Sequence, residues 1–223
     1  MPVQITAQDL QHLQSMVRQS ILAPTEYDAY GVVTEALILH KQPQDRYTLF
    51  PQMYLSWNPS NSGDLRGSIP DFVIGRYSDS YLHVRLQGGV EVKKAMAETR
   101  NLPSAIEAAK LDELHRLIRG TVFQAEDQAK AAVKGGRLPR DKELLWLIFV
   151  GPYFTTIKCG PFTEAELRTR GHKPNDSGDW LVALKIKLRK GEDSFRFPIY
   201  LLGTPEAVVE LERYITTTQV FIR

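Results

Sequence analysis

The sequence of 223 residues has a single cysteine, Cys159, and no marked excess of charge of either sign. One cysteine excludes an intramolecular disulfide and a zinc site built from several thiolates of the same chain. The 28 Lys and Arg residues nearly balance the 26 Asp and Glu residues, which gives a formal net charge of +2. A nucleic-acid partner would therefore have to meet a local basic patch, because the overall charge does not attract a polyanion.

Long hydrophobic runs and the common cofactor motifs are also lacking. No stretch approaches the roughly 18 consecutive apolar residues of a transmembrane helix, and the segment MPVQITAQDLQHLQ lacks the pattern of a secretory signal. We therefore expect an intracellular protein, cytoplasmic or nuclear, with no membrane partner. No HxH, HExxH, GxGxxG, P-loop or GxSxG pattern occurs, which argues against histidine-ligated metal sites, nucleotide cofactors and serine-hydrolase chemistry.

The pattern of apolar residues predicts a single α/β domain with a mixed sheet, spanning residues 1–223. Helices are predicted over residues 5–22, about 25–40, about 104–134 with a break near Gly120, and from Pro205 onward, with Thr6 and Thr204 as N-caps. Strands are predicted at 46–57, 69–77, 81–94, 144–150, 153–159, 181–188 and 195–202, with a polar loop at 170–179. The segment 144–150 (LLWLIFV) is the most hydrophobic strand and should lie in the middle of the sheet.

Two short motifs at neighbouring predicted strands carry the residues suited to chemistry. Pro70-Asp71 stands at the head of one strand, and Glu91-Val92-Lys93 stands at the end of the next. Because side chains alternate along a strand, Glu91 and Lys93 should project to one face while Val92 points into the core. Two carboxylates brought together by neighbouring strands suit a hard divalent cation such as Mg²⁺. A lysine beside them suits the phosphate of a phosphodiester substrate.

At these residues the sequence resembles the PD-(D/E)XK, or restriction-endonuclease-like, nuclease superfamily. The resemblance implies an αβββαβ core over about residues 25–160. The N-terminal helix 5–22 and a C-terminal extension 161–223, with extra strands and a terminal helix, would pack on this core. It also implies Mg²⁺ or Mn²⁺ held by Asp71, Glu91 and the Val92 carbonyl, with Lys93 as the catalytic lysine.

The same resemblance implies further site residues. Many members carry a glutamate on the helix before the three strands, where Glu35 stands, and this residue would be an auxiliary catalytic acid. Several carry glutamine and a second polar residue one turn apart on the helix after the third strand, where Gln124 and Gln128 stand. These two side chains would help to position the substrate backbone. Arg66 and Lys94 lie close to the motifs in sequence, and we expect them to contact the nucleic-acid backbone.

The strand register poses a difficulty for this site. A regular hairpin that turns near Asp79 would place Asp71 opposite Gln87 instead of Glu91, an offset of roughly 10 Å. Gly88 and Gly89 lie in the offset region. Glycine within a strand often marks a bulge or a bend, and such an irregularity would close the gap.

Two hypotheses for the function remain open at the level of sequence. The first, which the motifs favour, is a metal-dependent phosphodiester hydrolase that cleaves nucleic acid through Asp71, Glu91 and Lys93. The alternative is a catalytically silent binding or scaffolding protein on the same fold, which the near-neutral charge favours. The sequence does not distinguish DNA from RNA or single from double strands, and a homodimer remains open. A nuclease requires the three motif side chains to lie within a few ångströms of one another.

Overall fold

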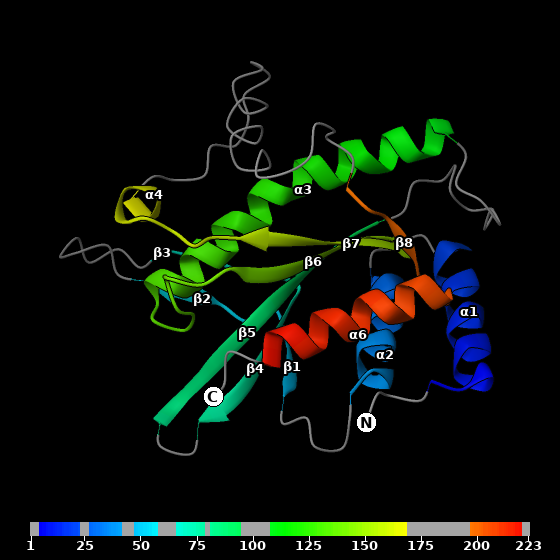
Figure 1. Cartoon of the computed structure of the whole chain (residues 1–223), viewed down its shortest axis with the longest axis horizontal. Coiled ribbons are helices and arrows are strands. Elements are labelled where there is room, and N and C mark those ends of the chain that lie inside the picture. The colour runs from blue at the N-terminus through cyan, green and yellow to red at the C-terminus, as the bar shows by residue number, and fades with distance from the viewer. Residues whose placement is uncertain are drawn as a thin grey trace.

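The computed structural model describes residues 5–22, 27–41, 47–57, 66–78, 81–94, 108–168 and 197–219. Its helices are α1 (Ala7–Leu22), α2 (Tyr27–Leu39), α3 (Ala108–Lys134), α4 (Glu164–Arg168) and α6 (Pro205–Gln219). Its strands are β1 (Thr48–Pro51), β2 (Leu55–Trp57), β3 (Arg66–Ser68), β4 (Phe72–Ser78), β5 (Tyr81–Lys93), β6 (Leu144–Val150), β7 (Tyr153–Cys159) and β8 (Tyr200–Leu201). The described chain is therefore a mixed α/β structure (Figure 1), in agreement with the predicted class.

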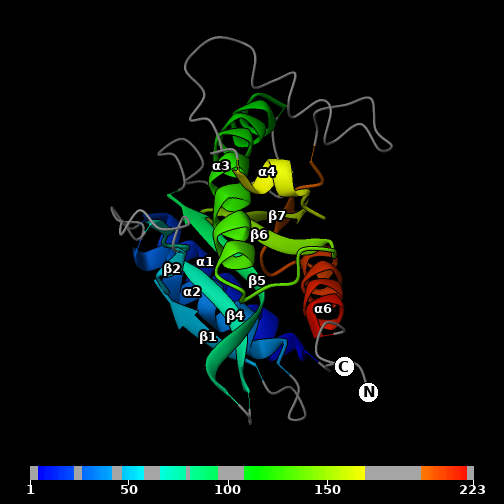
Figure 2. The same ribbon diagram turned by 90° about the vertical axis from the view of Figure 1, so that its left-hand side faces the viewer.

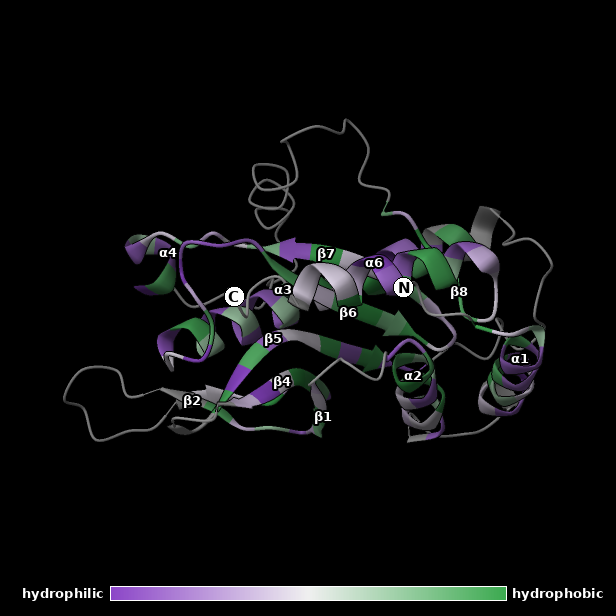
Figure 3. Ribbon diagram, turned by 60° about the horizontal axis from the view of Figure 1, so that its bottom comes forward, coloured by the Kyte–Doolittle hydropathy of each residue, from purple (hydrophilic) through white to green (hydrophobic). Residues whose placement is uncertain are grey.

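Six strands form one mixed sheet in the order β1-β4-β5-β6-β7-β8. β5 and β6 pair in parallel, and the other neighbouring strands pair in antiparallel fashion. The parallel pair needs a crossover connection, and α3 lies within that connection. β2 and β3 form a separate antiparallel ribbon that packs against α3. Every residue of β6 is buried and the strand pairs on both edges, which confirms its predicted central position (Figure 3).

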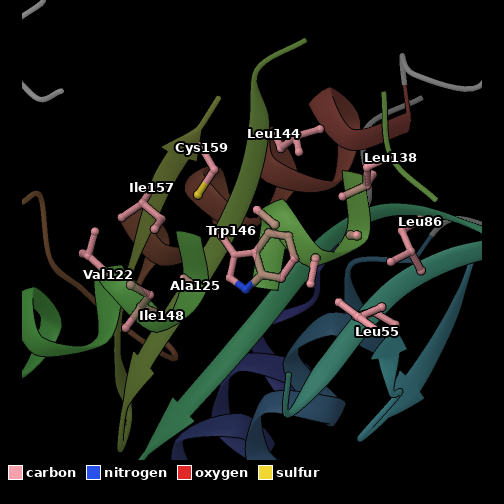
Figure 4. Packing of buried hydrophobic residues seen from close by; sticks show 14 of the residues in the cluster. Leu55, Leu86, Val122, Ala125, Leu138, Leu144, Trp146, Ile148, Ile157 and Cys159 are labelled. Atoms are coloured by element: carbon pink, nitrogen blue, oxygen red, sulfur yellow. The ribbon is translucent and has the colours of Figure 1, made fainter. Parts of the chain in front are cut away.

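Helices cover both faces of the six-stranded sheet (Figure 2). α3 covers one face, where Val122 and Ala125 lie in one cluster with Trp146 and Ile148 of β6 (Figure 4). α2 and α6 cover the opposite face and α1 packs against α2, so that their apolar residues form one cluster with the residues of β6 that alternate with these two. A strand buried on both faces has apolar side chains at successive positions, which explains the unbroken hydrophobic segment of β6.

Two helices begin at the caps that the sequence predicts. The hydroxyl oxygen of Thr6 accepts a hydrogen bond from the Asp9 N–H (3.2 Å), and the Asp9 carboxylate accepts one from the Thr6 N–H (2.9 Å). This reciprocal pair satisfies two amides at the start of α1. At α6, the Thr204 hydroxyl accepts from the Ala207 N–H (3.3 Å), and Pro205 is the first helical residue. Among the described helices, none has the length and apolarity needed to cross a bilayer.

Three predicted elements differ from the structure. The strand predicted at 46–57 is two strands, β1 and β2, in different sheets, because the chain turns at Gln52, whose φ is +48°. α3 runs through Gly120 without the predicted break, since one glycine costs a helix only about 1 kcal/mol. Within the predicted strand 195–202, the described part contains only β8. The loop predicted at 170–179 and the strand predicted at 181–188 lie outside the described residues.

The register between β4 and β5 differs from that of a regular hairpin, which removes the expected offset between Asp71 and Glu91. Near the turn Tyr77 pairs with Val84, whereas at the other end Phe72 pairs with Val90. The register shifts between Ile74 and Gly75, where β5 carries one additional residue, and shifts again beside the turn. The predicted irregularity next to Gly88 is present, but it shifts the register by one residue, whereas the shift between Tyr77 and Ser78 accounts for two. Together the two shifts bring the start of β4 level with the end of β5.

Gly88 and Gly89 have a second role, because large side chains occupy the space beside both of them. A Cβ atom on Gly89 would lie 1.9 Å from Cζ2 of Trp146, and one on Gly88 would lie 2.5 Å from the Tyr214 hydroxyl oxygen. Trp146 belongs to the cluster on the α3 face, and Tyr214 belongs to the cluster on the opposite face. The glycine pair therefore lets aromatic side chains approach β5 from both sides.

We predict that Gly89→Ala lowers the free energy of unfolding by about 1–3 kcal/mol, because the added methyl group overpacks the site of the Trp146 ring. Gly120→Ala is the matched control. No neighbouring atom lies within 4 Å of its added Cβ, so this variant should gain about 0.5–1 kcal/mol of stability. Chemical denaturation of both variants checks the prediction, and a Gly89→Ala protein as stable as the wild type would contradict it.

Candidate active site

Asp71 lies directly before β4, where its side chain reaches β5 and α2. One carboxylate oxygen, Oδ2, accepts a hydrogen bond from the backbone N–H of Val92 (2.7 Å). The other oxygen, Oδ1, accepts one from the Tyr30 hydroxyl on α2 (2.6 Å). These two contacts fix the carboxylate of Asp71 at the end of β5, beside the Glu91-Val92-Lys93 motif.

Glu91 and Lys93 project from β5 to the α3 face, as the alternation of side chains predicts. Lys93 Nζ lies 2.6 Å from Glu91 Oε1. Val92, between them, is fully buried in the cluster on the opposite face. The exposed fractions differ sharply, at 1% for the Glu91 side chain and 32% for that of Lys93. The lysine therefore lies at the solvent side of the pair, and the glutamate lies beneath it.

Two glutamines of α3 donate hydrogen bonds to the Glu91 carboxylate. Gln124 Nε2 donates to Oε1, and Gln128 Nε2 donates to Oε2 at 2.7 Å. Because the two residues are four apart, they share one side of the helix. Gln128 Nε2 also lies 3.4 Å from the carbonyl oxygen of Ile69, two residues before Asp71. The amides therefore orient the glutamate, a contact different from the substrate contact that the resemblance implies.

The electrostatic environment of Glu91 raises the pKa of its carboxyl group above the ordinary value. Burial raises the pKa of Glu91 above its ordinary value, and the negative charge of Asp71 raises this pKa further. The hydrogen bond and charge of Lys93, together with the Gln128 hydrogen bond, act in the opposite direction. Two carboxylates whose charges repel each other, with one ammonium group beside Glu91, form a site that gains from additional positive charge.

The oxygen atoms at this site suit a divalent cation of the Mg²⁺ type. Both oxygens of Asp71 and Oε2 of Glu91 accept one hydrogen bond each, whereas Oε1 of Glu91 accepts two, from Lys93 and Gln124. A carboxylate oxygen that accepts one hydrogen bond has a second lone pair for a cation. The N–H and C=O of one strand residue point to the same edge, so the Val92 carbonyl faces the Asp71 side. The next carbonyl, that of Lys93, faces β6 and accepts from the Gly151 N–H (2.8 Å). Two carboxylates and a carbonyl are hard oxygen ligands, which fit Mg²⁺ or Mn²⁺.

At this site the described residues offer two side chains that could bind a metal ion, the carboxylates of Asp71 and Glu91. The described part of the chain contains no group of three or more His, Cys, Asp or Glu side chains placed to hold a metal ion. Glu35 is half-buried on α2, and it is Tyr30, not Glu35, that hydrogen-bonds to Asp71. Five residues along a helix rotate the side-chain direction by about 140°, so these two residues leave α2 in different directions.

The two basic residues predicted to bind the substrate, Lys94 and Arg66, lie on different parts of the structure. Lys94 follows the last residue of β5 and is exposed, next to Lys93. Arg66 begins β3, where it pairs with Trp57 of β2. Lys94 therefore lies beside the motif, Arg66 lies in the β2–β3 ribbon, and the contact of either residue with nucleic acid stays a prediction.

Tyr30 is the site residue that sequence reasoning missed. Its hydroxyl group binds Asp71, and its ring packs edge-on against Phe72 with a centroid distance of 5.3 Å. A tyrosine at the border of an amphipathic helix is usually interpreted as a core residue, so its position carried no functional signal. The only sequence feature that could have indicated it is its place on the same helix as the predicted acid Glu35.

Comparison of the chain with family models, curated proteins and solved structures finds no match in any of the three. What the site does is therefore argued from its own residues and their geometry.

We predict a pH-dependent difference in stability between the wild type and Glu91→Gln in the presence of EDTA. The raised pKa of Glu91 means that the folded protein binds its proton more tightly than the unfolded chain does. The resulting stabilisation is complete below the ordinary pKa of glutamate and is lost as the pH rises through the raised pKa of the folded state. The stability of Glu91→Gln relative to the wild type should therefore increase with pH. Denaturation curves from pH 4.5 to neutrality check this, and a difference that does not vary with pH would contradict it.

Proposed function

We propose that the protein is a metal-dependent nuclease that hydrolyses phosphodiester bonds in nucleic acid at Asp71, Glu91 and Lys93. The observation that carries the proposal is the meeting of the two sequence motifs. Asp71 hydrogen-bonds to the backbone of Val92, and Lys93 contacts the carboxylate of Glu91. The PD-(D/E)XK resemblance implies this grouping of two carboxylates and a lysine.

The order of elements supports a restriction-endonuclease-like core. Along the chain, α2 precedes the three sheet strands β1, β4 and β5, which are followed by α3 and β6. This is the αβββαβ order that the resemblance implies, and the β2–β3 ribbon is an insertion between β1 and β4. The strands β7 and β8 and the helix α6 extend the core at its C-terminal side.

Asp71, Glu91 and the Val92 carbonyl would hold Mg²⁺ or Mn²⁺, and Lys93 would contact the phosphate. When bound, such an ion supplies Lewis acidity at the phosphate and lowers the pKa of a coordinated water. Lys93 has two ammonium protons beyond the one that it gives to Glu91, and its side chain is partly exposed. The lysine can therefore stabilise negative charge on a phosphate oxygen while Glu91 holds it in place.

The remaining described contacts keep the acids in position. The Tyr30 hydroxyl holds Asp71, and the amides of Gln124 and Gln128 hold Glu91. The hydrogen bond from Gln128 lowers the pKa of Glu91 and so favours its charged form, which is the form that binds a cation. The hydrogen bonds thus prepare the site before a cation or a substrate arrives.

A catalytically silent scaffold is the second candidate, and the burial of Glu91 is the observation that favours it. The Glu91 side chain is 1% exposed, and both of its oxygens have protein donors. A purely structural network would look the same in this respect. The two candidates differ in whether the site takes up a divalent cation and cuts a substrate.

We predict that the purified chain cleaves at least one of four substrates, single- or double-stranded DNA or RNA, in Mg²⁺ or Mn²⁺ and not in EDTA. Asp71→Asn and Lys93→Met should each lower the rate by a factor on the order of 10² or more, because each removes a charge that the reaction uses. Gel analysis of end-labelled substrates gives the rates.

The matched controls are Asp141→Asn and Lys158→Met, which change exposed residues outside the site. Both should cut at the wild-type rate. A wild-type protein that leaves all four substrates intact in both metals would overturn the nuclease proposal and favour the scaffold.

We further predict that Mn²⁺ binds the wild type and raises its melting temperature, since a ligand of the folded state stabilises that state. Asp71→Asn should bind Mn²⁺ at least about tenfold more weakly, and Asp141→Asn should bind it as the wild type does. Isothermal titration calorimetry measures the affinities without reference to activity. Equal affinities in the wild type and Asp71→Asn would remove Asp71 from the metal site.

A further inference from the structure

Two large apolar side chains are exposed next to each other beside the candidate site. Tyr54 is 48% exposed and Ile69 is 53% exposed. Leu55 and Ser68 form the last pair of the β2–β3 ribbon. Tyr54 precedes Leu55 and Ile69 follows Ser68, so the two residues lie opposite each other directly beyond this pair. Leu55 points to the α3 side and is fully buried, so by alternation Tyr54 lies on the outer face of the ribbon.

The ring of Tyr54 lies close to Gly67 of β3. A Cβ atom on Gly67 would lie 2.4 Å from two carbons of the Tyr54 ring, Cε2 and Cζ. Glycine is therefore the residue that lets the ring lie over β3. The ring thus lies beside β3, while about half of the residue stays exposed to solvent. The ribbon therefore presents an aromatic side chain to solvent next to a glycine that leaves room for it.

Both strands of the ribbon are attached to the site through their ends. The Gln52 N–H, two residues before Tyr54, donates to the Asp71 carbonyl oxygen (2.9 Å). On the other strand, Asp71 follows Ile69 by two residues, which limits the distance between their Cα atoms to about 7 Å. The Ile69 carbonyl also faces Gln128, which holds Glu91. The exposed ring is thus tied to the carboxylates by short, structured connections.

We propose that Tyr54 is a stacking platform for an unpaired nucleobase next to the phosphate that is cleaved, so that the substrate is single-stranded at this position. The inference rests on the proposed nuclease function. A base inside a duplex has both faces covered by its neighbours, whereas an unpaired base has a free face for an aromatic side chain. Stacking on a ring does not read base edges, so the contact accepts any of the bases.

The apolar neighbour and the nearby cations fit the same ligand. Ile69 extends the apolar surface beside the ring, while Lys93 and Lys94 lie at the end of β5, where a phosphate backbone would pass. The base thus meets the ribbon, and its phosphate meets the lysines.

The test measures binding of fluorescent single-stranded oligonucleotides to the full chain carrying Asp71→Asn, which prevents cutting. In this background Tyr54→Ala should weaken binding about tenfold, and Tyr54→Phe should change it less than about twofold. Tyr77→Ala is the matched control, because this tyrosine is 64% exposed at the turn end of β4. Gly67→Ala should reproduce the Tyr54→Ala defect, because its added methyl group displaces the ring.

A series of oligonucleotides with one abasic nucleotide at successive positions separates stacking from structural support. At one position, loss of the base should weaken binding when Tyr54 is present and should have no effect in Tyr54→Ala. A Tyr54→Ala defect of equal size on every abasic oligonucleotide would show that the ring only supports the fold, and would overturn the inference. Equal Tyr54 dependence on a duplex would overturn it as well.

The outcome is distinguishable from failure of the nuclease proposal. A wild type that cuts nucleic acid, with Tyr54 variants that bind normally, refutes the stacking platform alone. A wild type that neither cuts nor binds any nucleic acid refutes both.

Discussion

The candidate site depends on the register between β4 and β5. The extra residue that β5 carries opposite the Ile74–Gly75 step shifts the pairing, so that Phe72 meets Val90 and the next residue, Asp71, comes level with Glu91. β4 begins there, which leaves the Val92 N–H free of a strand partner on that edge, and the Asp71 carboxylate takes its place. A bulge of this kind re-aims side chains at the end of a strand. The hydrogen bond to Val92, the contact of Tyr30 with Asp71 and the closeness of the two acids depend on this shift together with the one beside the turn.

The buried carboxylate of Glu91 is the costly feature of this arrangement. Burial of a charged group is unfavourable unless hydrogen bonds and an opposite charge compensate for it, and here Lys93, Gln124 and Gln128 provide both. Such polar networks stabilise a fold little compared with apolar residues of the same volume. The stability of the sheet therefore does not explain why an acid stands at this position, between two clusters that are otherwise apolar. The proposed role in binding a cation would explain it.

Much of the fold could be predicted because the patterns concerned are local. The caps at Thr6 and Thr204 and the seven apolar residues of β6 each follow from neighbours in sequence. In the same way, the alternation of side chains along a strand predicts that Glu91 and Lys93 project to one face of the sheet. The turn at Gln52 could not be predicted, since a positive φ is unusual for glutamine. Neither could the contact of Tyr30 with Asp71, nor the use of Gln124 and Gln128 to hold Glu91, because these contacts join residues that only the complete tertiary structure brings together.

The parallel pairing of β5 with β6 has a consequence for how the protein folds. The hydrogen bonds that define the site join residues separated by 21, 33, 37 and 41 positions in the chain. Contacts over such separations form only after the entropy of closing long loops has been overcome, and parallel strands that need a helical crossover form slowly. α3 must dock before Gln128 can meet Glu91. A partly folded chain therefore has no paired carboxylates, and the chemistry of the site becomes available only when the sheet and both helical layers are complete.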